Sequence, residues 1–259
     1  MKKNKMMRLA SAMMVLTLMS TSVISGTFAK YVTSDSATDT ARVAKWGVNV
    51  VATDQTMFST SYIGTDSKTT VEVGGGLTDK LVAPGTSRDA IDLFSITGQP
   101  EVAVKIEISI NDSTKKDVFL KAGKYSNMIT GGDATDSFEF SGDSYYPVVF
   151  ILKNDGSEVA KGNLAVIEEY LESTVSKAYV APNTNLTTTY GTYTLEWAWE
   201  FPSTEDTLVD QKDTLLGNLA ANPSILAKHD GTDFVALTVD SDFSTTLNFD
   251  LSVTVTQVD

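Results

Sequence analysis

The strongest constraint on the fold is an alternation of apolar and other residues that recurs in three separate stretches of the chain. Successive side chains of a β-strand point to opposite faces of a sheet, so this spacing places one apolar face against a core. The apolar positions are Val102, Val104, Ile106, Ile108 and Ile110; Tyr193, Leu195, Trp197, Trp199 and Phe201; and Leu247, Phe249, Leu251, Val253 and Val255. The sequence therefore predicts half-buried antiparallel strands.

Further strands and one helix complete the predicted architecture. The apolar run 145–152 is typical of a strand inside a sandwich, and Asn154-Asp155-Gly156 after it predicts a hairpin turn. Residues 90–96 and 102–110 are expected to form a pair of strands joined by a tight connection at Gly98-Gln99-Pro100. A further strand is predicted at residues 190–201. Helical spacing of apolar residues, with Asn163 as the cap, predicts one clear helix; its positions are Leu164, Ile167, Leu171 and Val175. We expect a mainly β chain, an antiparallel jelly-roll-like β-sandwich with one or two inserted helices, in a single domain over residues 42–259.

The first 29 residues have the pattern of a signal peptide. Lys2, Lys3, Lys5 and Arg8 precede an uncharged apolar stretch of about 16 residues, shorter than the roughly 20 that a spanning helix needs. Small residues at Thr27 and Ala29 predict cleavage between Ala29 and Lys30. The mature chain would be secreted, would meet the membrane only during export, and would begin with a small, polar, extended arm at residues 30–41.

Composition excludes several classes of function. The chain has no cysteine and one histidine, which removes disulfides, Cys-ligated metals, thiol nucleophiles and sites that need two imidazoles. Removal of residues 1–29 takes away four basic and no acidic residues, which leaves 16 basic against 33 acidic and a net charge of −17. This excess of acid disfavours nucleic acid as a partner. It also indicates that salt, calcium or acid would promote self-association by reducing repulsion.

Three groups of residues are candidate sites. The lone His229, in a His-Asp-Gly sequence, is typical of a surface turn, and no GxSxG elbow supports a hydrolase, so no catalytic residue is assigned. Trp197, Trp199 and Phe201 are either a sugar-stacking platform or, as the more frequent case, core. The densest group of carboxylates is Asp206, Asp210 and Asp213, which we expect to lie in a loop. These residues are a candidate structural calcium site, although a solvated loop without a metal is the more frequent case. No other cofactor is expected.

Two segments resemble the TasA/camelysin family of exported proteins. Residues 25–31, Ser-Gly-Thr-Phe-Ala-Lys-Tyr, followed by the polar stretch 33–37 and a strand at 43–51, look like the aromatic-Ala cleavage region, polar segment and first strand of that family. Residues 82–86, Val-Ala-Pro-Gly-Thr, followed by 91–96, Gly98 and 102–110, are similar to its L-x-PGD turn, strand, glycine and strand. Thr86 stands where the family usually has an acidic residue, and Gln99-Pro100 departs from its N-x-GS turn.

The absence of cysteine is common among exported proteins of Gram-positive-type bacteria, and the lack of a convincing catalytic group favours a structural or binding protein over an enzyme. The resemblance implies a structural protein. It implies cleavage by a SipW-type signal peptidase and head-to-tail polymerisation into fibres of the extracellular or biofilm matrix, at or beyond the cell surface. Its donor strand would be the arm, which begins with Lys30, Tyr31, Val32, Thr33 and Ser34, and an accessory fibre subunit is a further expected partner besides the chain itself. Two alternatives stay open: a monomeric adhesin or glycan-binding module, and a camelysin-like peptidase, which a chain with one histidine and no cysteine supports poorly.

Overall fold

The computed structural model describes residues 42–52, 57–59, 61–64, 70–72, 80–111, 115–127, 138–201 and 207–258. The chain divides into two compact units, residues 1–43 and 44–259, and all described helices and strands belong to the second. The predicted signal peptide, the cleavage site at Ala29 and Lys30, and the arm at 30–41 lie outside the described residues.

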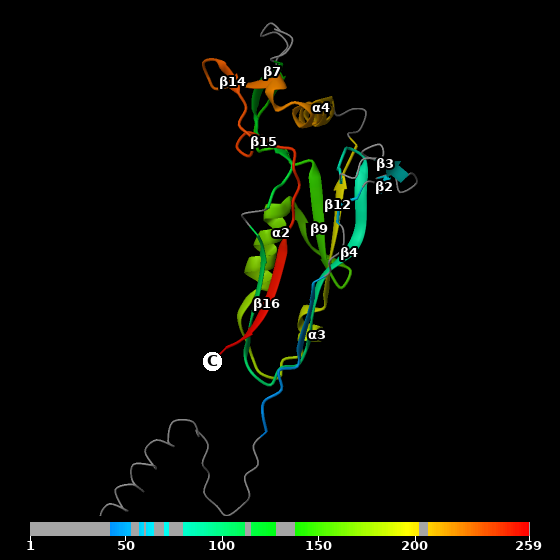
Figure 1. Ribbon diagram of the computed structural model, residues 1–259, viewed down its shortest axis with the longest axis vertical. Helices are drawn as coiled ribbons and strands as arrows, with labels where there is room; N and C mark the ends of the chain where they lie inside the picture. Colours follow the sequence, from blue (N-terminus) through cyan, green and yellow to red (C-terminus); the bar gives the residue numbers. More distant parts are fainter. Residues whose placement is uncertain are drawn as a thin grey trace, which may run out of the picture. The chain divides into compact units, whose positions relative to one another are not determined.

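The larger sheet is antiparallel throughout (Figure 1). Its strands follow the order β10-β9-β12-β4-β2-β3, and β1 pairs with the far half of the long strand β4. The strands are β10 (Ser157–Gly162), β9 (Val148–Asn154), β12 (Thr192–Trp199), β4 (Thr86–Gly98), β2 (Ser61–Gly64), β3 (Thr70–Glu72) and β1 (Val48–Ala52).

A second antiparallel sheet has the order β11-β5-β16, with β11 (Lys177–Val180), β5 (Val104–Ile110) and β16 (Leu251–Gln257). The inner faces of both sheets contribute to one hydrophobic core. The predicted alternation is confirmed in two of the stretches: each apolar residue of β5 is at most 2% exposed, and Tyr193, Leu195, Trp197 and Trp199 of β12 are at most 6% exposed. The chain is a mainly β, antiparallel sandwich, as the sequence predicted.

Two details of the strand predictions were wrong. Residues 90–96 and 102–110 do not pair with each other, because β4 and β5 lie in different sheets and Gly98-Gln99-Pro100 begins the crossing between them. The predicted strand at 190–201 is shorter at both ends: Tyr190 closes α3 (Leu186–Tyr190), and Phe201 follows β12 with its side chain 66% exposed beside Gly85.

The predicted helix and the predicted hairpin both form. Asn163 Oδ1 accepts the Val166 N–H at 3.2 Å and caps α2 (Leu164–Tyr170), which continues as the π-helical turn η3 (Leu171–Val175). All four apolar residues of the predicted spacing are buried. Asp155 and Gly156 both have positive φ, 46° and 82°, which is the backbone of a two-residue type I′ turn between β9 and β10.

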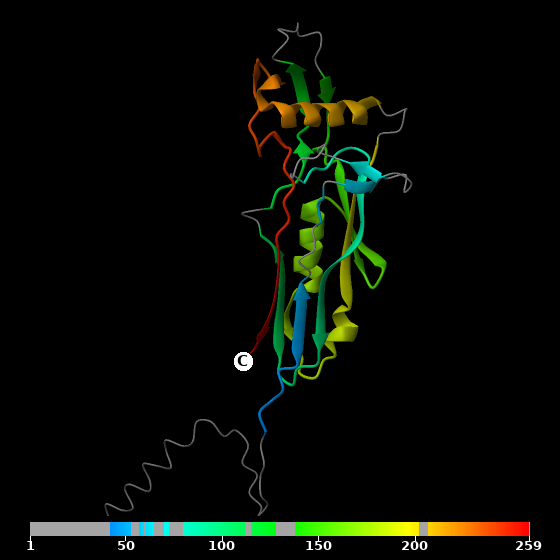
Figure 2. The same cartoon turned by 45° about the vertical axis from the view of Figure 1, so that its right-hand side comes forward.

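A smaller sheet and a helix were not predicted (Figure 2). The sheet has the order β14-β13-β7-β8, with β14 (Phe234–Ala236), β13 (Leu226–His229), β7 (Gly123–Asn127) and β8 (Phe138–Phe140). A two-stranded ladder pairs β15 (Phe243–Ser244) with β6 (Phe119–Leu120), and α4 (Thr207–Ala221) and η4 (Pro223–Ile225) precede β13. In the described part of the chain, no helix has the length and apolarity that a membrane span requires.

Candidate functional site

The feature with the clearest binding chemistry is the outer edge of β16. This strand is the last in its sheet and pairs with β5 in unbroken register over all seven residues. Asn248 N–H and C=O bond to Lys116 at 2.8 and 3.2 Å, and Val258 N–H bonds to Ala103 at 2.9 Å. Even-numbered residues therefore face the inner partner, and the odd-numbered residues from Leu247 to Gln257 direct their N–H and C=O groups to the open edge.

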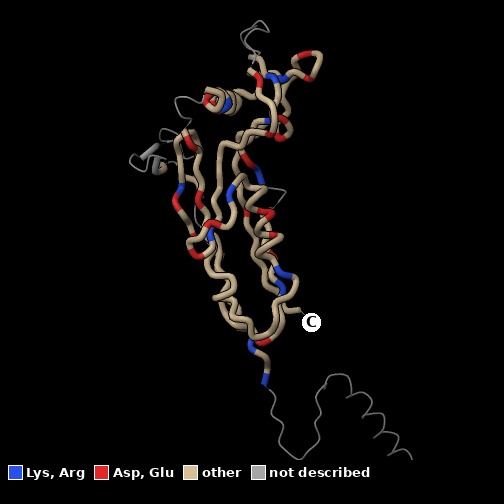
Figure 3. The backbone as a smooth tube through the Cα atoms, turned by 180° about the vertical axis from the view of Figure 1, so that it is seen from behind, with Lys and Arg blue, Asp and Glu red and all other residues tan. Residues whose placement is uncertain are grey.

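β16 has no charge, no proline and no register shift, the features that often protect an edge strand, although β1 lies beside it. Edge strands are commonly protected by charges, prolines or bulges. β10 carries Glu158 and Lys161 with a register shift, and β11 begins with Lys177 and also shifts register. β16 has the sequence Leu-Ser-Val-Thr-Val-Thr-Gln, without charge or proline, and Figure 3 shows this segment free of charged residues. Among the described strands none pairs with its outer side.

An open hollow of about 860 Å³ lies beside the upstream part of this edge. Its lining comes from the end of β1, from the middle of β4, from α4 and from the residues that lead into β16. The apolar lining residues include Ala52, Met57, Phe58, Leu81, Val82, Ile91, Leu93, Ala220, Leu247, Phe249 and Leu251. β4 pairs with β2 at Thr86 and Ser87 and with β1 from Phe94 onward, so on this side no described strand pairs with residues 88–93. Lys80, Asp92 and Asp250 also line the hollow, so it is not wholly apolar. We call it the apolar groove after the larger group of lining residues.

Trp197 holds one wall of the apolar groove in place. Its Nε1 donates to the Met57 carbonyl at 3.1 Å, and its ring contacts Phe58 and Tyr62 at centroid distances of 5.8 and 5.0 Å. Trp197 and Trp199 are 1% and 5% exposed. The indole rings therefore belong to the core, and these two residues form no sugar-stacking platform.

The end of the sandwich opposite the apolar groove fixes the start of β1. Gly47 and Gly98 have positive φ, and the Gln99 N–H bonds to Gly47 C=O at 3.0 Å. One step further out, Lys45 and Glu101 are joined twice: the Glu101 N–H bonds to Lys45 C=O at 2.9 Å, and Glu101 Oε2 accepts the Lys45 N–H at 2.8 Å. We call these contacts the basal clamp.

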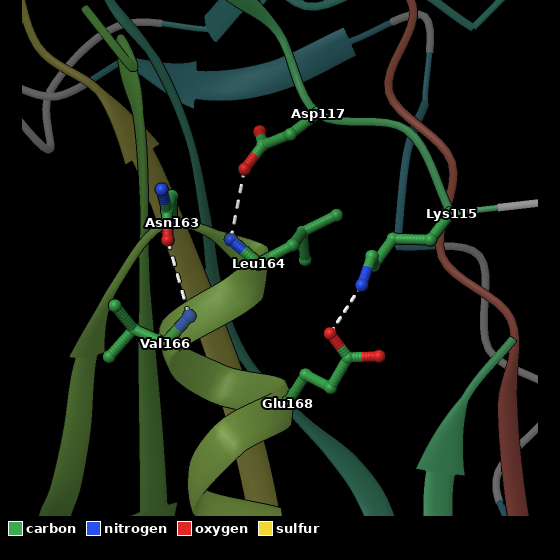
Figure 4. A network of polar contacts seen from close by, with 6 residues as sticks. All are labelled: Lys115, Asp117, Asn163, Leu164, Val166 and Glu168. Carbon is green, nitrogen blue, oxygen red and sulfur yellow. Dashed lines mark hydrogen bonds and ion pairs between the residues drawn. The ribbon is translucent and has the colours of Figure 1, made fainter. Parts of the chain in front are cut away.

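A polar network surrounds the first turn of α2 (Figure 4). Asp117 Oδ2 accepts the Leu164 N–H at 2.9 Å, and Lys115 forms an ion pair with Glu168. Asp117 Oδ1 and Glu168 Oε1 are buried, and neither has a hydrogen-bond partner among the described residues. Burial raises the pKa of Asp117 to about 6, against the opposing effects of the Leu164 and Val118 N–H groups and of Lys115. The network holds the helix in place at an electrostatic cost near neutral pH.

We expect Asp117→Asn to remove a pH dependence of stability. The folded-state pKa lies above the ordinary value of 3.8, so the folded chain binds the proton more tightly than the unfolded chain. Asp117 therefore stabilises the wild type fully below about pH 4, and this stabilisation is lost as pH rises through 6; the change is up to about 3 kcal/mol. Urea unfolding of both proteins between pH 4 and 7.5 measures it. An equal pH slope in wild type and variant would contradict the assignment.

The candidate calcium ligands do not lie in a loop, which corrects the expectation for Asp210 and Asp213. Both lie on α4, and Asp206 is outside the described residues. Asp213 is 6% exposed, and its Oδ1 accepts the Tyr145 hydroxyl at 2.7 Å and the Trp199 indole N–H at 3.1 Å. Burial raises the pKa of Asp213. Within the described ranges no three His, Asp or Glu side chains converge as a metal site would require. Asp213 ties α4 to the sandwich, and calcium binding stays a prediction.

His229 lies at a turn, as predicted. It ends β13, its Nδ1 accepts the Gly231 N–H at 3.1 Å, and its ring meets Phe234 edge-on at 5.1 Å. Asp230 Oδ1 accepts the N–H groups of Thr232 and Asp233, both at 2.9 Å, which closes the turn. The His229 side chain thus stabilises the turn through its contacts with Gly231 and Phe234.

No family model, no curated protein and no solved structure matches this chain. The candidate site therefore depends on geometry alone. Sequence reasoning identified the alternation in 247–255 but not the open edge, because the pattern shows which face of a strand is buried and not which side has a neighbour. The absence of charge from 251 to 257 was the available signal.

Proposed function

We propose that this protein is an exported structural subunit that polymerises head-to-tail into fibres of an extracellular or biofilm matrix. Each subunit would donate its N-terminal arm, residues 30–41, to an edge strand of the next. The observation that supports this most is the long, uncharged, regular edge of β16 beside the apolar groove. An extended peptide adds to such an edge through main-chain hydrogen bonds, and a head-to-tail contact that does not close gives a filament.

Binding of the arm is expected to be more favourable at an edge beside an apolar groove than at an edge that offers backbone hydrogen bonds alone. Six outward residues on β16 and its approach offer about twelve hydrogen bonds, each with a net contribution of roughly 1 kcal/mol. Ordering twelve arm residues costs about 1–2 kcal/mol each, so backbone pairing alone does not hold the arm. Burial of a large apolar side chain adds about 1.5–3 kcal/mol. Covering Leu247, Phe249 and Leu251, and burying Tyr31 and Val32 of the arm, supplies that further stabilisation.

Export would precede assembly in this scheme. A SipW-type signal peptidase would release the mature chain after Ala29, and its net charge would keep subunits apart until assembly. The chain itself is the main proposed partner, with an accessory fibre subunit as a second. The proposed function is structural, and it assigns a catalytic role to none of the described residues.

Deletion of residues 30–38 tests the proposal. We expect the truncated protein to keep the far-ultraviolet circular dichroism of the mature chain, because the described sandwich begins after the deletion. Sedimentation velocity should show polymers for residues 30–259 and a monomer for residues 39–259 under the same conditions. Polymers of similar size from both proteins would show that the arm is not the connecting element.

A further inference from the structure

We propose that Asp230 is a site of spontaneous covalent modification. The amide nitrogen of Gly231 closes on the Asp230 carboxyl carbon to give a succinimide, which reopens in part to isoaspartate, and His229 is the base. The site is the turn that joins β13 to β14, the edge strand of the smaller sheet, and residues 230–233 are exposed to water. The chemistry concerns this turn alone and does not depend on the proposed function.

The sequence contains two Asp-Gly pairs, Asp155-Gly156 and Asp230-Gly231. Aspartate followed by glycine is open to this cyclisation, because glycine has no Cβ to hinder the attack of its nitrogen on the preceding side chain. A Cβ placed on either glycine would meet nothing within 4 Å, so crowding does not distinguish the two pairs. The difference between them comes from the groups around each carboxylate and each glycine nitrogen.

His229 supplies a base at the nitrogen that has to react. Its Nδ1 accepts the Gly231 N–H at 3.1 Å, and its ring meets Phe234 edge-on at a centroid distance of 5.1 Å. An amide nitrogen attacks a carboxyl carbon only as its proton leaves, and a general base has to lie within hydrogen-bond reach of the proton that it removes. The only histidine of the chain therefore contacts the proton whose removal starts the cyclisation.

The hydrogen bonds of the Asp230 carboxylate favour attack on it. Its Oδ1 accepts the N–H groups of Thr232 and Asp233, both at 2.9 Å, and the Asp230 N–H bonds to Asp233 C=O at 3.0 Å. These bonds direct the side chain along the peptide units that follow it, the first of which contains the Gly231 nitrogen. Attack places negative charge on an oxygen of the tetrahedral intermediate, and backbone donors already in position stabilise such a charge.

The reaction balances in atoms and charge. The N–H groups of Asp233 and Thr232 lower the pKa of Asp230, so the reactant at neutral pH is the carboxylate. The bond from Gly231 N to Asp230 Cγ forms, and the bond from Cγ to Oδ2 breaks. Oδ2 leaves as water with the proton that His229 takes from the nitrogen and one proton from solvent. Water then opens the succinimide at either carbonyl carbon, which gives aspartate or isoaspartate and releases one proton.

Asp155-Gly156 lacks this arrangement and is an internal reference. Oδ1 of Asp155 accepts the Thr192 N–H at 3.0 Å, which ties the carboxylate to the start of β12 and not to the peptide units that follow it. Its Oδ2 lies so close to Gly191 that a Cβ placed on that glycine would be 2.3 Å away. We therefore expect Asp230 to react while Asp155 stays aspartate.

Site-resolved mass spectrometry of the mature chain, residues 30–259, tests this inference. During incubation at neutral pH in heavy-oxygen water, each passage through the succinimide incorporates one heavy oxygen, and electron-transfer fragmentation distinguishes isoaspartate from aspartate. We expect both signals to rise at least tenfold faster at Asp230 than at Asp155. His229→Phe keeps a ring beside Phe234 and has no base, so it should slow the reaction at Asp230 at least fivefold and leave Asp155 unchanged.

Two further comparisons separate the loss of the base from the loss of the turn. His229→Gln keeps a hydrogen-bond acceptor that is too weak to act as a base, so it should react as slowly as His229→Phe. The wild type unfolded in urea should react more slowly at Asp230 than the folded wild type. Equal rates at the two Asp-Gly pairs, wild-type rates in both variants, or a faster reaction in the unfolded chain would each overturn the inference.

Discussion

Gly98→Ala is expected to destabilise the sandwich by about 2–6 kcal/mol, or to prevent folding. Gly98 has a φ of +114°, and a Cβ placed there would lie 1.8 Å from the Gly47 carbonyl oxygen. The obstacle is backbone, which cannot rotate away as a flexible side chain does. The substitution combines a left-handed backbone, which costs a non-glycine residue about 1–3 kcal/mol, with overpacking, which costs about 1–3 kcal/mol. Urea unfolding followed by tryptophan fluorescence measures the change.

Gly142→Ala is the matched control for Gly98→Ala. Gly142 also has a positive φ, +95°, but a Cβ there meets nothing within 4 Å. Gly142→Ala should lose only the conformational part, about 1–3 kcal/mol. If both variants lose the same free energy of unfolding, the close approach of Gly98 to Gly47 has no energetic importance. The basal clamp would then need another explanation for its stability.

Trp197→Ala is expected to cost about 3–5 kcal/mol, as large aromatic truncations in a core do. The indole is 1% exposed, and its loss also leaves the Met57 carbonyl without the N–H that it accepts. Because Phe58 and Tyr62 pack on this ring, the wall of the apolar groove should lose its order together with the global stability. Thermal unfolding, with hydrogen exchange of the segment 57–62, reports both effects.

Two controls accompany the tryptophan variant. Trp46→Ala removes an indole that is 41% exposed and should change stability by less than about 1 kcal/mol. Trp197→Phe keeps most of the ring volume and loses the hydrogen bond, so it should fall between the two. A Trp197→Ala protein as stable as the wild type would mean that the groove wall is not held by this residue.

The sequence predicted the core of the sandwich well because burial has a period that a strand or helix must follow. The alternation at Val104–Ile110 and the helical spacing from Leu164 to Val175 both follow from one buried face. The type I′ turn at Asp155-Gly156 was predictable because few residues tolerate two positive φ angles in succession. These signals are local, and each is complete within one segment.

Other features depend on which segments meet, and no local pattern carries that information. Strands β4 and β5 follow one another in the chain but lie in opposite sheets, so their tight connection suggested a pairing that does not form. Asp213 was expected in a loop with other carboxylates. Its burial follows instead from two donors, Tyr145 and Trp199, that lie 68 and 14 residues away. The sequence pattern could not predict that β16 lies at the edge of its sheet, because the order of the strands decides which neighbours a strand has.

Negative-stain electron microscopy of the purified mature chain, residues 30–259, tests the central claim most directly. We expect unbranched filaments that form from the single purified protein and lengthen with protein concentration. Discrete single particles of monomer size, at every protein concentration, salt concentration and pH at which the sandwich stays folded, would contradict the account of this protein as a fibre subunit.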